Sequence, residues 1–370
     1  MKINIRHILI QVFIAVVALE LLSWFASTKN LLLFNQTPRI YGPTLIEPIR
    51  TESHAWGVWR NPNTSSRHKR LCFDVAISTN ELGARDDSFE NSPVGSIILL
   101  GDSFAEGFGV SHSDSAATIL EKKAQQPVHN FGIAGNFGPL QEYLIYKEFV
   151  EQIKHESVLI FVLPANDFTD NDISLWSSYA AQRERYRPYY GTENPLFPIY
   201  HEDAITSRDQ NHGEPKLSFL DKLKNVLVQY TWSANSLLTL KYLSNPPEPY
   251  IEEAPFISFY NKASSRQQEN LLAAYHAISE AAAFRPVFFV IIPDKRDIEY
   301  FNIRERDESY KELPWFKGLD KIATTTGGQL LDLLDHVPKD YESLFHSCDG
   351  HWSVKGNAWA ADKIYKAFFE

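Results

Sequence analysis

Short apolar runs alternate with segments of helical periodicity along the chain, and this alternation predicts its main elements. Five apolar runs are typical of buried strands: 97–100, 128–135, 157–167, 286–293 and 328–334. Apolar positions three and four apart predict helices over 113–124, 139–153, 264–284, 315–326 and 354–369. The run at 157–167 is apolar on both faces, as in a buried parallel strand. This alternation predicts an α/β fold with a five-stranded parallel sheet.

The alternation is interrupted once, and a further stretch precedes it. Residues 170–262 carry Pro- and Tyr-rich segments with a candidate helix near 217–243, so we expect an insertion in a core domain over 96–370. Residues 30–95 show turn residues and little helical period, and CFDVAIST (72–79) alternates as an edge strand does. We therefore predict an N-terminal extension over 30–95 that packs on the core, with its NELGARD turn over the sheet edge.

The first 29 residues form a separate segment. Lys2 and Arg6 precede the run 8–26, in which Glu20 is the one acidic residue. A helix over this run spans about 28 Å, close to the thickness of a bilayer core. Positive charge before the run predicts a cytoplasmic N-terminus and an exported remainder. We expect 1–29 to be an uncleaved membrane anchor; the alternative is a cleaved signal peptide, for which small residues at a cleavage site are hard to find.

Composition narrows the range of partners. The formal net charge is −10 with no long basic run, which argues against nucleic acid as a main partner. Aromatic residues make up 13% of the chain, and they serve either as core or as concave surfaces for sugars or lipids. In the insertion we expect them either to form a lid or side wall over the strand ends or to pack in the ordinary way; they are Trp176, Tyr186, Tyr189, Tyr190 and Trp232.

Candidate chemistry gathers at the carboxyl ends of the strands, where ligands bind in open parallel sheets. Ser103 follows the first strand, Gly135 ends the second in a glycine-rich turn, and Asn166 follows the third. Asp349 and His351 lie just before the last helix. We expect these residues to lie together at one edge of the sheet.

These residue types suit nucleophilic attack on an ester. A serine hydroxyl needs a base within hydrogen-bond reach, so Ser103 is the candidate nucleophile, His351 the base and Asp349 the group that orients the imidazole. The backbone N–H groups of Ser103 and Gly135 and the side-chain amide of Asn166 are candidate donors to the oxyanion. The GDSFA segment lacks the second glycine of the G-x-S-x-G elbow, which argues against the α/β-hydrolase fold.

Four blocks of the sequence resemble those of the SGNH (GDSL-type) hydrolase family. GDSFAEGFG resembles its nucleophile block, GIAGN its glycine block, PAND its asparagine block and DGHW its acid–base block. The resemblance covers about 97–168 and 284–370. It implies a flavodoxin-like three-layer α/β/α fold and esterase or acyl-transfer chemistry, with no metal and no organic cofactor.

The acid–base block departs from the common family pattern. Asp349 stands two residues before His351, whereas many members place the aspartate three residues before, where this chain has Cys348. His351 could instead be oriented by a hydrogen bond to a backbone carbonyl. The D-x-H-W spacing resembles a branch of exported SGNH proteins that act on bacterial polysaccharide acetylation. The segment CFDVAISTNELGARD, with HAWGVWRNPN upstream, resembles the leader region of membrane-anchored envelope members.

The chain has two cysteines, Cys72 and Cys348. An exported body would fold in an oxidising compartment, which permits a disulfide between them. Two unpaired, buried thiols are the alternative.

The residues and the resemblance together predict a membrane-anchored serine esterase with its catalytic domain outside the cytoplasm, in the periplasm or the extracellular space. Its expected substrates are O-acyl esters, in particular acetyl esters, of a small molecule or an envelope carbohydrate. Two alternatives stay open. One is an O-acyltransferase to a polysaccharide with the same triad, and the other is a non-catalytic carbohydrate-binding protein of the same fold.

Overall fold

The computed structural model describes residues 5–29, 31, 50–69, 72–90, 95–135, 137–173, 187–200, 218–244, 259–283, 285–303, 308–347 and 349–370. The chain divides into two compact units. Unit 1 comprises 1–48, 66–76 and 213–254, and unit 2 comprises 49–65, 77–212 and 255–370. All the candidate catalytic residues belong to unit 2.

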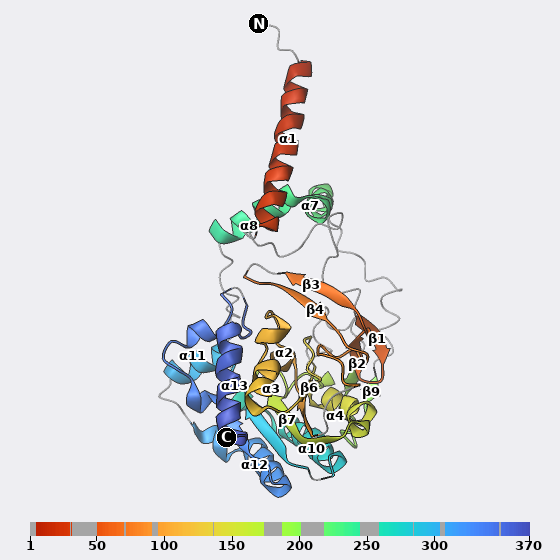
Figure 1. Ribbon diagram of the computed structural model, residues 1–370, viewed down its shortest axis with the longest axis vertical. Helices are drawn as coiled ribbons and strands as arrows, with labels where there is room; N and C mark the ends of the chain where they lie inside the picture. The colour runs from red at the N-terminus through yellow and green to blue at the C-terminus, as the bar shows by residue number, and fades with distance from the viewer. Residues whose placement is uncertain are drawn as a thin grey trace. The chain divides into compact units, whose positions relative to one another are not determined.

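Unit 2 is built around a five-stranded parallel sheet (Figure 1). In chain order its strands are β5 (Ser96–Leu100), β6 (Val128–Asn130), β7 (His155–Val162), β10 (Val287–Ile291) and β11 (Leu330–Asp332). Across the sheet they lie in the order β6-β5-β7-β10-β11. This is the 2-1-3-4-5 order of flavodoxin-like folds, and it confirms the predicted α/β class and its five strands.

The central strands are apolar at almost every position because both faces of the sheet are covered. β5 and β10 are buried along their whole length, and β7 is buried at every residue but one. The register places Ile98 beside Val158, and Ile160 beside Phe289. Burial on both faces explains why these runs show no alternation of polar and apolar residues.

Helices cover both faces of the sheet, and they include α3 (Ala116–Ala124), α4 (Pro139–Glu148), α10 (Ser265–Ala281), α12 (Pro314–Thr326) and α13 (Val354–Phe368). α3 packs against α13, whereas α10 packs against both α4 and α12. The connections β5 to β6 and β6 to β7 run in opposite directions along the sheet, so right-handed crossovers place their helices on opposite faces. The result is the predicted three-layer arrangement.

Shorter elements complete the described part of unit 2. α2 (Ser103–Glu106) follows β5 directly, and α9 (Phe259–Lys262) precedes α10. The hairpin-like pairs are β1 (Arg50–His54) with β2 (Gly57–Arg60), and β8 (Pro188–Tyr189) with β9 (Ile199–Tyr200). Most of a third pair belongs to unit 1: β3 (Ser65–Lys69) pairs with β4 (Asp74–Ser78), and β4 shows the alternating burial expected for the segment 72–79.

The structure contains two helices where the sequence predicted one. The segment near 217–243 forms α7 (Phe219–Tyr230) and α8 (Trp232–Ser244), so the prediction of one continuous helix was wrong. Thr231 separates the two helices, because its Oγ1 accepts the Ala234 N–H (3.3 Å) and so begins a new helix.

A further helix, α11 (Lys295–Ile303), has no counterpart in the prediction. It begins two residues after Pro293, where Asp294 Oδ1 accepts the N–H groups of Arg296 (2.6 Å) and Asp297 (2.9 Å). Capping by an aspartate after proline is a common helix start, but the helix that follows is short and its apolar stripe is narrow.

Parts of the predicted N-terminal extension, 49–65 and 77–95, belong to unit 2. Trp56 and Trp59 are buried there edge to face, with ring centroids 6.5 Å apart, in the same apolar cluster as β5. Gly83 lies against this pair with a φ of +82°, and a Cβ there would meet Trp59 Nε1 at 2.7 Å. The NELGARD turn therefore requires glycine at this position.

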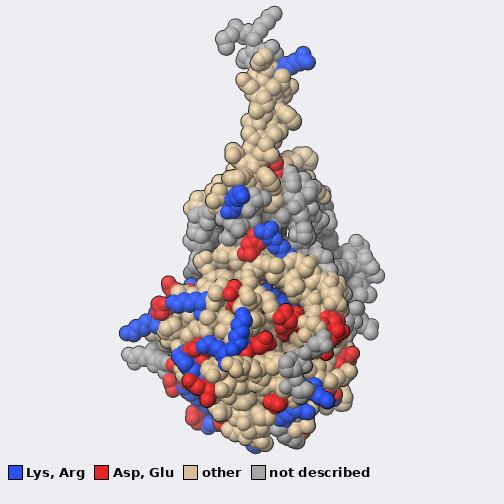
Figure 2. Space-filling model, viewed as in Figure 1, with Lys and Arg blue, Asp and Glu red and all other residues tan. Residues whose placement is uncertain are grey.

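Unit 1 holds α1 (Ile5–Thr28) together with α7 and α8. Over Ile5–Ser27, α1 is long and apolar enough to be a membrane anchor or a signal sequence. Figure 2 shows the described part of α1 almost without charged side chains, whereas acidic and basic side chains are interspersed over the face of unit 2 that is in view.

Gly83→Ala is expected to destabilise the protein by about 2–5 kcal/mol, because about 1–2 kcal/mol of left-handed strain adds to about 1–3 kcal/mol of overpacking against Trp59. Gly327→Ala is the matched control, since Gly327 has a φ of +78° but no atom lies within 4 Å of where its Cβ would be. Urea unfolding of both variants measures the difference. Equal losses would contradict the close packing at Gly83.

Candidate active site

The turn that carries Ser103 forms where β5 ends. Gly101 has a φ of +144°, and a Cβ there would meet Ala105 Cβ at 2.9 Å, so glycine permits a sharp turn that other residues would resist. Asp102 caps α2 by accepting the Phe104 N–H (2.9 Å). Ser103 is the first residue of α2, at the carboxyl end of the sheet.

Ser103, His351 and Asp349 form a continuous hydrogen-bonded chain. Ser103 Oγ lies 2.7 Å from His351 Nε2. Asp349 Oδ1 contacts His351 Nδ1, and the same oxygen accepts the His351 backbone N–H at 3.0 Å. One carboxylate thus orients both the backbone and the ring of the histidine, so a spacing of two residues is sufficient. In this orientation Nε2 faces the serine and can accept its proton.

Aromatic rings hold the imidazole in place. The ring centroids of Phe104 and Phe108 lie 5.2 and 4.3 Å from that of His351. Trp352 is buried and packs edge-on against Phe104 at 4.9 Å. The His351 side chain is still 26% exposed, so solvent and substrate can reach it.

Asn166 lies beside the nucleophile turn. Its Nδ2 donates to Asp102 Oδ2 at 3.0 Å, while Asp102 Oδ1 accepts the Phe104 N–H. Asp102 therefore links the asparagine to the helix that carries Ser103, as a hydrogen-bonding residue of the turn. Because Nδ2 carries two hydrogens, the second is available to a substrate oxygen.

The glycine-rich turn after β6 lies against α2. A Cβ on Gly132 would meet Glu106 N at 2.5 Å and Ala105 Cβ at 2.6 Å, so this approach requires glycine. Gly135 has a φ of +115°. Asn136, the last residue of the predicted block, lies outside the described residues. The turn that holds Gly135 is thus kept close to the helix of Ser103.

A buried ion pair, which the sequence analysis missed, supports this turn. Arg60 Nη2 lies 2.7 Å from Glu106 Oε2, and both side chains are at most 2% exposed. Glu106 also accepts the Ala134 N–H, and Arg60 Nη1 donates to the Gly132 carbonyl at 3.5 Å. The N-terminal extension, the nucleophile helix and the glycine turn therefore meet at one carboxylate.

Arg85, from the NELGARD turn, holds the chain that follows α2. Its guanidinium donates to the carbonyl oxygens of Glu106 (3.1 Å), Gly107 (2.6 Å) and Val110 (2.5 Å). Arg85 is buried, so these contacts are shielded from water. Arg85 thus has a structural role, and its partners are carbonyl groups of the segment that follows Ser103.

Asp102, the hydrogen-bond partner of Asn166, belongs to a cluster of buried carboxyl groups. Asp102, Glu142 and Asp167 are at most 2% exposed, and burial raises the pKa of all three carboxyls. Asp167 accepts the Leu163 N–H (2.8 Å) and so braces the loop of Asn166. Glu142 carries no sequence signal that separates it from a surface acid. In the described part of the chain, no group of three or more His, Cys, Asp or Glu side chains could hold a metal ion.

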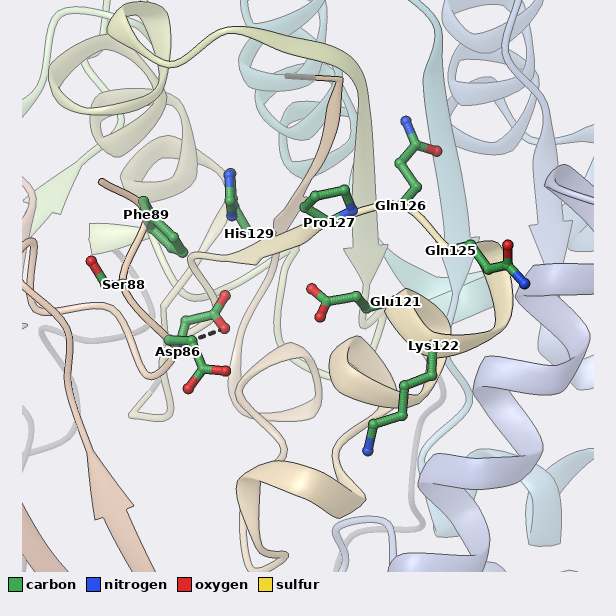
Figure 3. A pocket seen from close by; sticks show the side chains of 10 residues that line it. Asp86, Ser88, Phe89, Glu121, Lys122, Gln125, Gln126, Pro127 and His129 are labelled. Carbon is green, nitrogen blue, oxygen red and sulfur yellow. Dashed lines mark hydrogen bonds between the residues drawn. The ribbon is translucent and has the colours of Figure 1, made fainter. Parts of the chain in front are cut away.

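A cavity of about 510 Å³ lies along the edge strand β6, and its lining includes none of the residues above (Figure 3). It is formed by 86–89, by the C-terminal half of α3 and by the start of β6. Phe89 and His129 have ring centroids 4.2 Å apart, and Asp86 accepts the Asn130 N–H at 2.7 Å. Burial raises the pKa of the Asp86 carboxyl to about 8 and lowers that of the His129 imidazole to about 4.

Only one of the two cysteines, Cys72, is among the described residues. Cys72 is disulfide-bonded. Cys348 lies outside the described residues, so the pairing of Cys72 with Cys348 stays a prediction.

The aromatic residues of the insertion serve packing where they are described. Tyr189 and Tyr190 are buried, and Tyr190 packs in a small apolar cluster with Leu140. Trp232 is buried in unit 1. The other two aromatic residues named for a lid or side wall, Trp176 and Tyr186, lie outside the described residues.

No model of a known protein family matches the chain, and no curated protein matches it. Among solved structures it is similar to a member of the lipolytic protein G-D-S-L family from Veillonella parvula DSM 2008 (11% identity, TM-score 0.38, covering 74% of this chain and 98% of that chain). It is also similar to the lipase/acylhydrolase from Enterococcus faecalis (12%, 0.35, 74% and 94%) and to the salicylyl-acyltransferase SsfX3 from a tetracycline biosynthetic pathway (12%, 0.35, 76% and 56%). Values this low do not assign a function to this chain.

Arg60→Met is expected to destabilise the protein by about 3–5 kcal/mol, because it leaves the Glu106 carboxylate buried without its partner. The double variant Arg60→Met/Glu106→Gln should recover part of this loss, since the amide oxygen still accepts the Ala134 N–H and no charge is buried. Urea unfolding of the single and double variants measures the coupling. Strictly additive losses would show that the two side chains act independently.

The pH dependence of stability is expected to depend on Asp86. Its pKa of about 8 in the folded protein lies above its ordinary value of 3.8, so the folded state holds a proton that the unfolded state releases. The contribution of Asp86 to stability is therefore present below about pH 4 and is lost as the pH rises through about 8. Asp86→Asn keeps an oxygen for the Asn130 N–H but cannot ionise. Melting curves between about pH 5 and 8 should show a steeper loss in the wild type than in this variant; parallel curves would contradict the raised pKa.

Proposed function

We propose that this protein is a serine esterase of the SGNH type that hydrolyses O-acyl esters through an acyl-enzyme. The observation that carries the proposal is the 2.7 Å contact between Ser103 Oγ and His351 Nε2, with Asp349 on the other ring nitrogen. A serine, an imidazole and a carboxylate joined in this order make a nucleophile, its base and the group that orients the base.

The reaction follows from these contacts. Ser103 Oγ attacks the ester carbonyl carbon as its proton moves to His351 Nε2, and Asp349 stabilises the imidazolium that forms. The tetrahedral intermediate collapses when the leaving alcohol takes that proton, which leaves the acyl group on Ser103. Water then attacks the acyl-enzyme with His351 again as base, which releases the acid and restores the serine.

The developing oxyanion needs donors in fixed positions. The proposed donors are the N–H groups of Ser103 and Gly135 and the free hydrogen of Asn166 Nδ2. Asp102 positions the asparagine by accepting its other hydrogen at 3.0 Å. One such donor is typically worth about 3–4 kcal/mol of activation free energy.

We place the enzyme on a membrane with unit 2 outside the cytoplasm. The proposal is supported by the length and apolar character of α1, with positive residues before it. The proposed substrates are acetyl esters on an envelope carbohydrate, which follows from the resemblance of the D-x-H-W spacing to exported SGNH proteins. A short-chain ester is the appropriate first substrate.

Ser103→Ala and His351→Gln are expected to lose labelling by a fluorophosphonate probe and to lower kcat on 4-nitrophenyl acetate by about 10³-fold or more. His346→Gln is the matched control, a nearby histidine outside the hydrogen-bonded chain from Ser103 to Asp349, and it should retain both activities. Equal turnover by wild type and Ser103→Ala would refute the esterase.

The acceptor of the acyl group separates an esterase from an acyltransferase. An O-acetylated oligosaccharide incubated with the enzyme should release acetate at a rate independent of added sugar. Transfer product that grows with the concentration of an unacetylated oligosaccharide, at the expense of acetate, would assign the acyltransferase instead.

A further inference from the structure

An apolar face of α7 is exposed in unit 1. The exposed apolar side chains recur at helical spacing along one side of the helix: Phe219, Leu220, Leu223, Val226, Leu227 and Tyr230. On α8, Leu237 and Leu240 are exposed as well. A surface helix of a globular protein normally turns such a face toward a core, so this face requires a partner.

α8 packs against α1, and Glu20 joins them. The two carboxylate oxygens of Glu20 accept the Trp232 N–H (2.7 Å) and the Ser233 N–H (3.0 Å), in the first turn of α8. A carboxylate within an apolar helix is costly unless it is paired. The helix N-terminus supplies both hydrogen bonds and a favourable dipole.

Two further polar side chains on the Glu20 side of α1 are also buried. Ser23 and Ser27, three and seven residues after Glu20, are buried, while apolar side chains around them are exposed. α1 therefore has one polar stripe that packs within unit 1 and a broad apolar surface that does not.

The contact at Glu20 determines how deep in a membrane the first turn of α8 would lie. Glu20 lies eight residues before Thr28, which is about 12 Å along the axis from the end of α1. If α1 spans a bilayer about 30 Å thick, the first turn of α8 lies at or below the level of the headgroups. Asn235 Nδ2 ties α7 to this turn by donating to the carbonyl oxygens of Val228 (2.7 Å) and Thr231 (2.9 Å).

We propose that α7 and α8 lie in the membrane interface, with the apolar face of α7 in the acyl-chain region of the leaflet that surrounds the C-terminal end of α1. The proposal rests on the anchoring role proposed for α1. The partner is lipid because α8, which packs against α7, also packs against α1, the helix proposed to span the membrane. Exposed lysines of unit 1, Lys29, Lys224 and Lys241, can meet anionic headgroups.

The consequence concerns the substrate. The chain passes between unit 1 and unit 2 after residue 48, on both sides of 66–76, and in the insertion at 212 and 255. If unit 1 is held at the membrane, these connections restrict how far the catalytic unit can move from the surface, which favours esters on molecules held close to the membrane.

The test places nitroxide labels on the full-length protein in nanodiscs of phosphatidylcholine and phosphatidylglycerol. Single cysteines replace Leu223 or Leu227 on the apolar face, and labelling is done without reductant so that the disulfide of Cys72 is kept. Lys224→Cys is the matched control, an exposed position about 100° around the helix from Leu223. Val16→Cys reports on α1. Power-saturation EPR measures collisions with oxygen and with a water-soluble nickel complex.

Labels at 223 and 227 are expected to lose collisions with the nickel complex and to gain those with oxygen, relative to 224. Nickel access at 223 and 227 equal to that at 224, with Val16 shielded, would overturn the interfacial position and leave the anchor intact. Nickel access at Val16 would overturn both. Dipolar broadening between labels at 223 would show that a second copy covers the face, which also overturns the proposal. Each labelled variant is assayed on 4-nitrophenyl acetate, so a failure of the esterase is seen separately.

Discussion

The Glu106 carboxylate is the contact on which the candidate site depends, because three separate segments of unit 2 meet at it. Arg60 arrives from the N-terminal extension, Ala134 from the glycine turn, and Glu106 itself ends the nucleophile helix. Burying two charges costs more than their attraction returns unless further hydrogen bonds complete the site, and the Ala134 N–H supplies one. Gly132 allows the turn to come this close. The distance between Gly135, a proposed oxyanion donor, and Ser103 therefore depends on a contact outside the hydrogen-bonded chain from Ser103 to Asp349.

Local sequence patterns were sufficient to predict the sheet and the residues that lie together at its carboxyl edge. Ser103 and His351 are 248 positions apart, yet parallel strands bring their ends to the same edge, so their proximity could be expected. The roles of Arg60 and Arg85 could not be predicted. Charged side chains are expected at the surface, and no local sequence feature indicates that either arginine has a buried partner. The break between α7 and α8 has one local signal, the cap at Thr231, but its other support comes from Glu20, more than 200 residues away, which no local pattern indicates.

The charge on the buried acids Asp102, Glu142 and Asp167 affects the proposed reaction. An ionised carboxylate beside a developing oxyanion would repel it, and a cluster of them would oppose the proposed reaction. Burial raises the pKa of Asp102, Glu142 and Asp167, which reduces the negative charge that the cluster carries. Asp102 can then serve as a hydrogen-bonding bridge to Asn166 at a smaller electrostatic cost. Burial of these acids therefore limits the repulsion that they would exert on a developing negative charge.

Carboxyl groups that accept backbone N–H groups recur across the molecule, and they explain how a chain of net charge −10 buries so many acids. The acceptors are Glu20, Asp86, Asp102, Glu106, Asp167 and Asp349. Such bonds act on the main chain, so each acid determines the path of a turn or the start of a helix, and where the carboxylate is ionised the bond is stronger than a neutral one. At Asp86, Asp102 and Asp167 the pKa is raised nonetheless, because desolvation outweighs the hydrogen bonds. At Asp349 the same contact also orients His351, so a device that elsewhere shapes the backbone here aligns the candidate base with its serine.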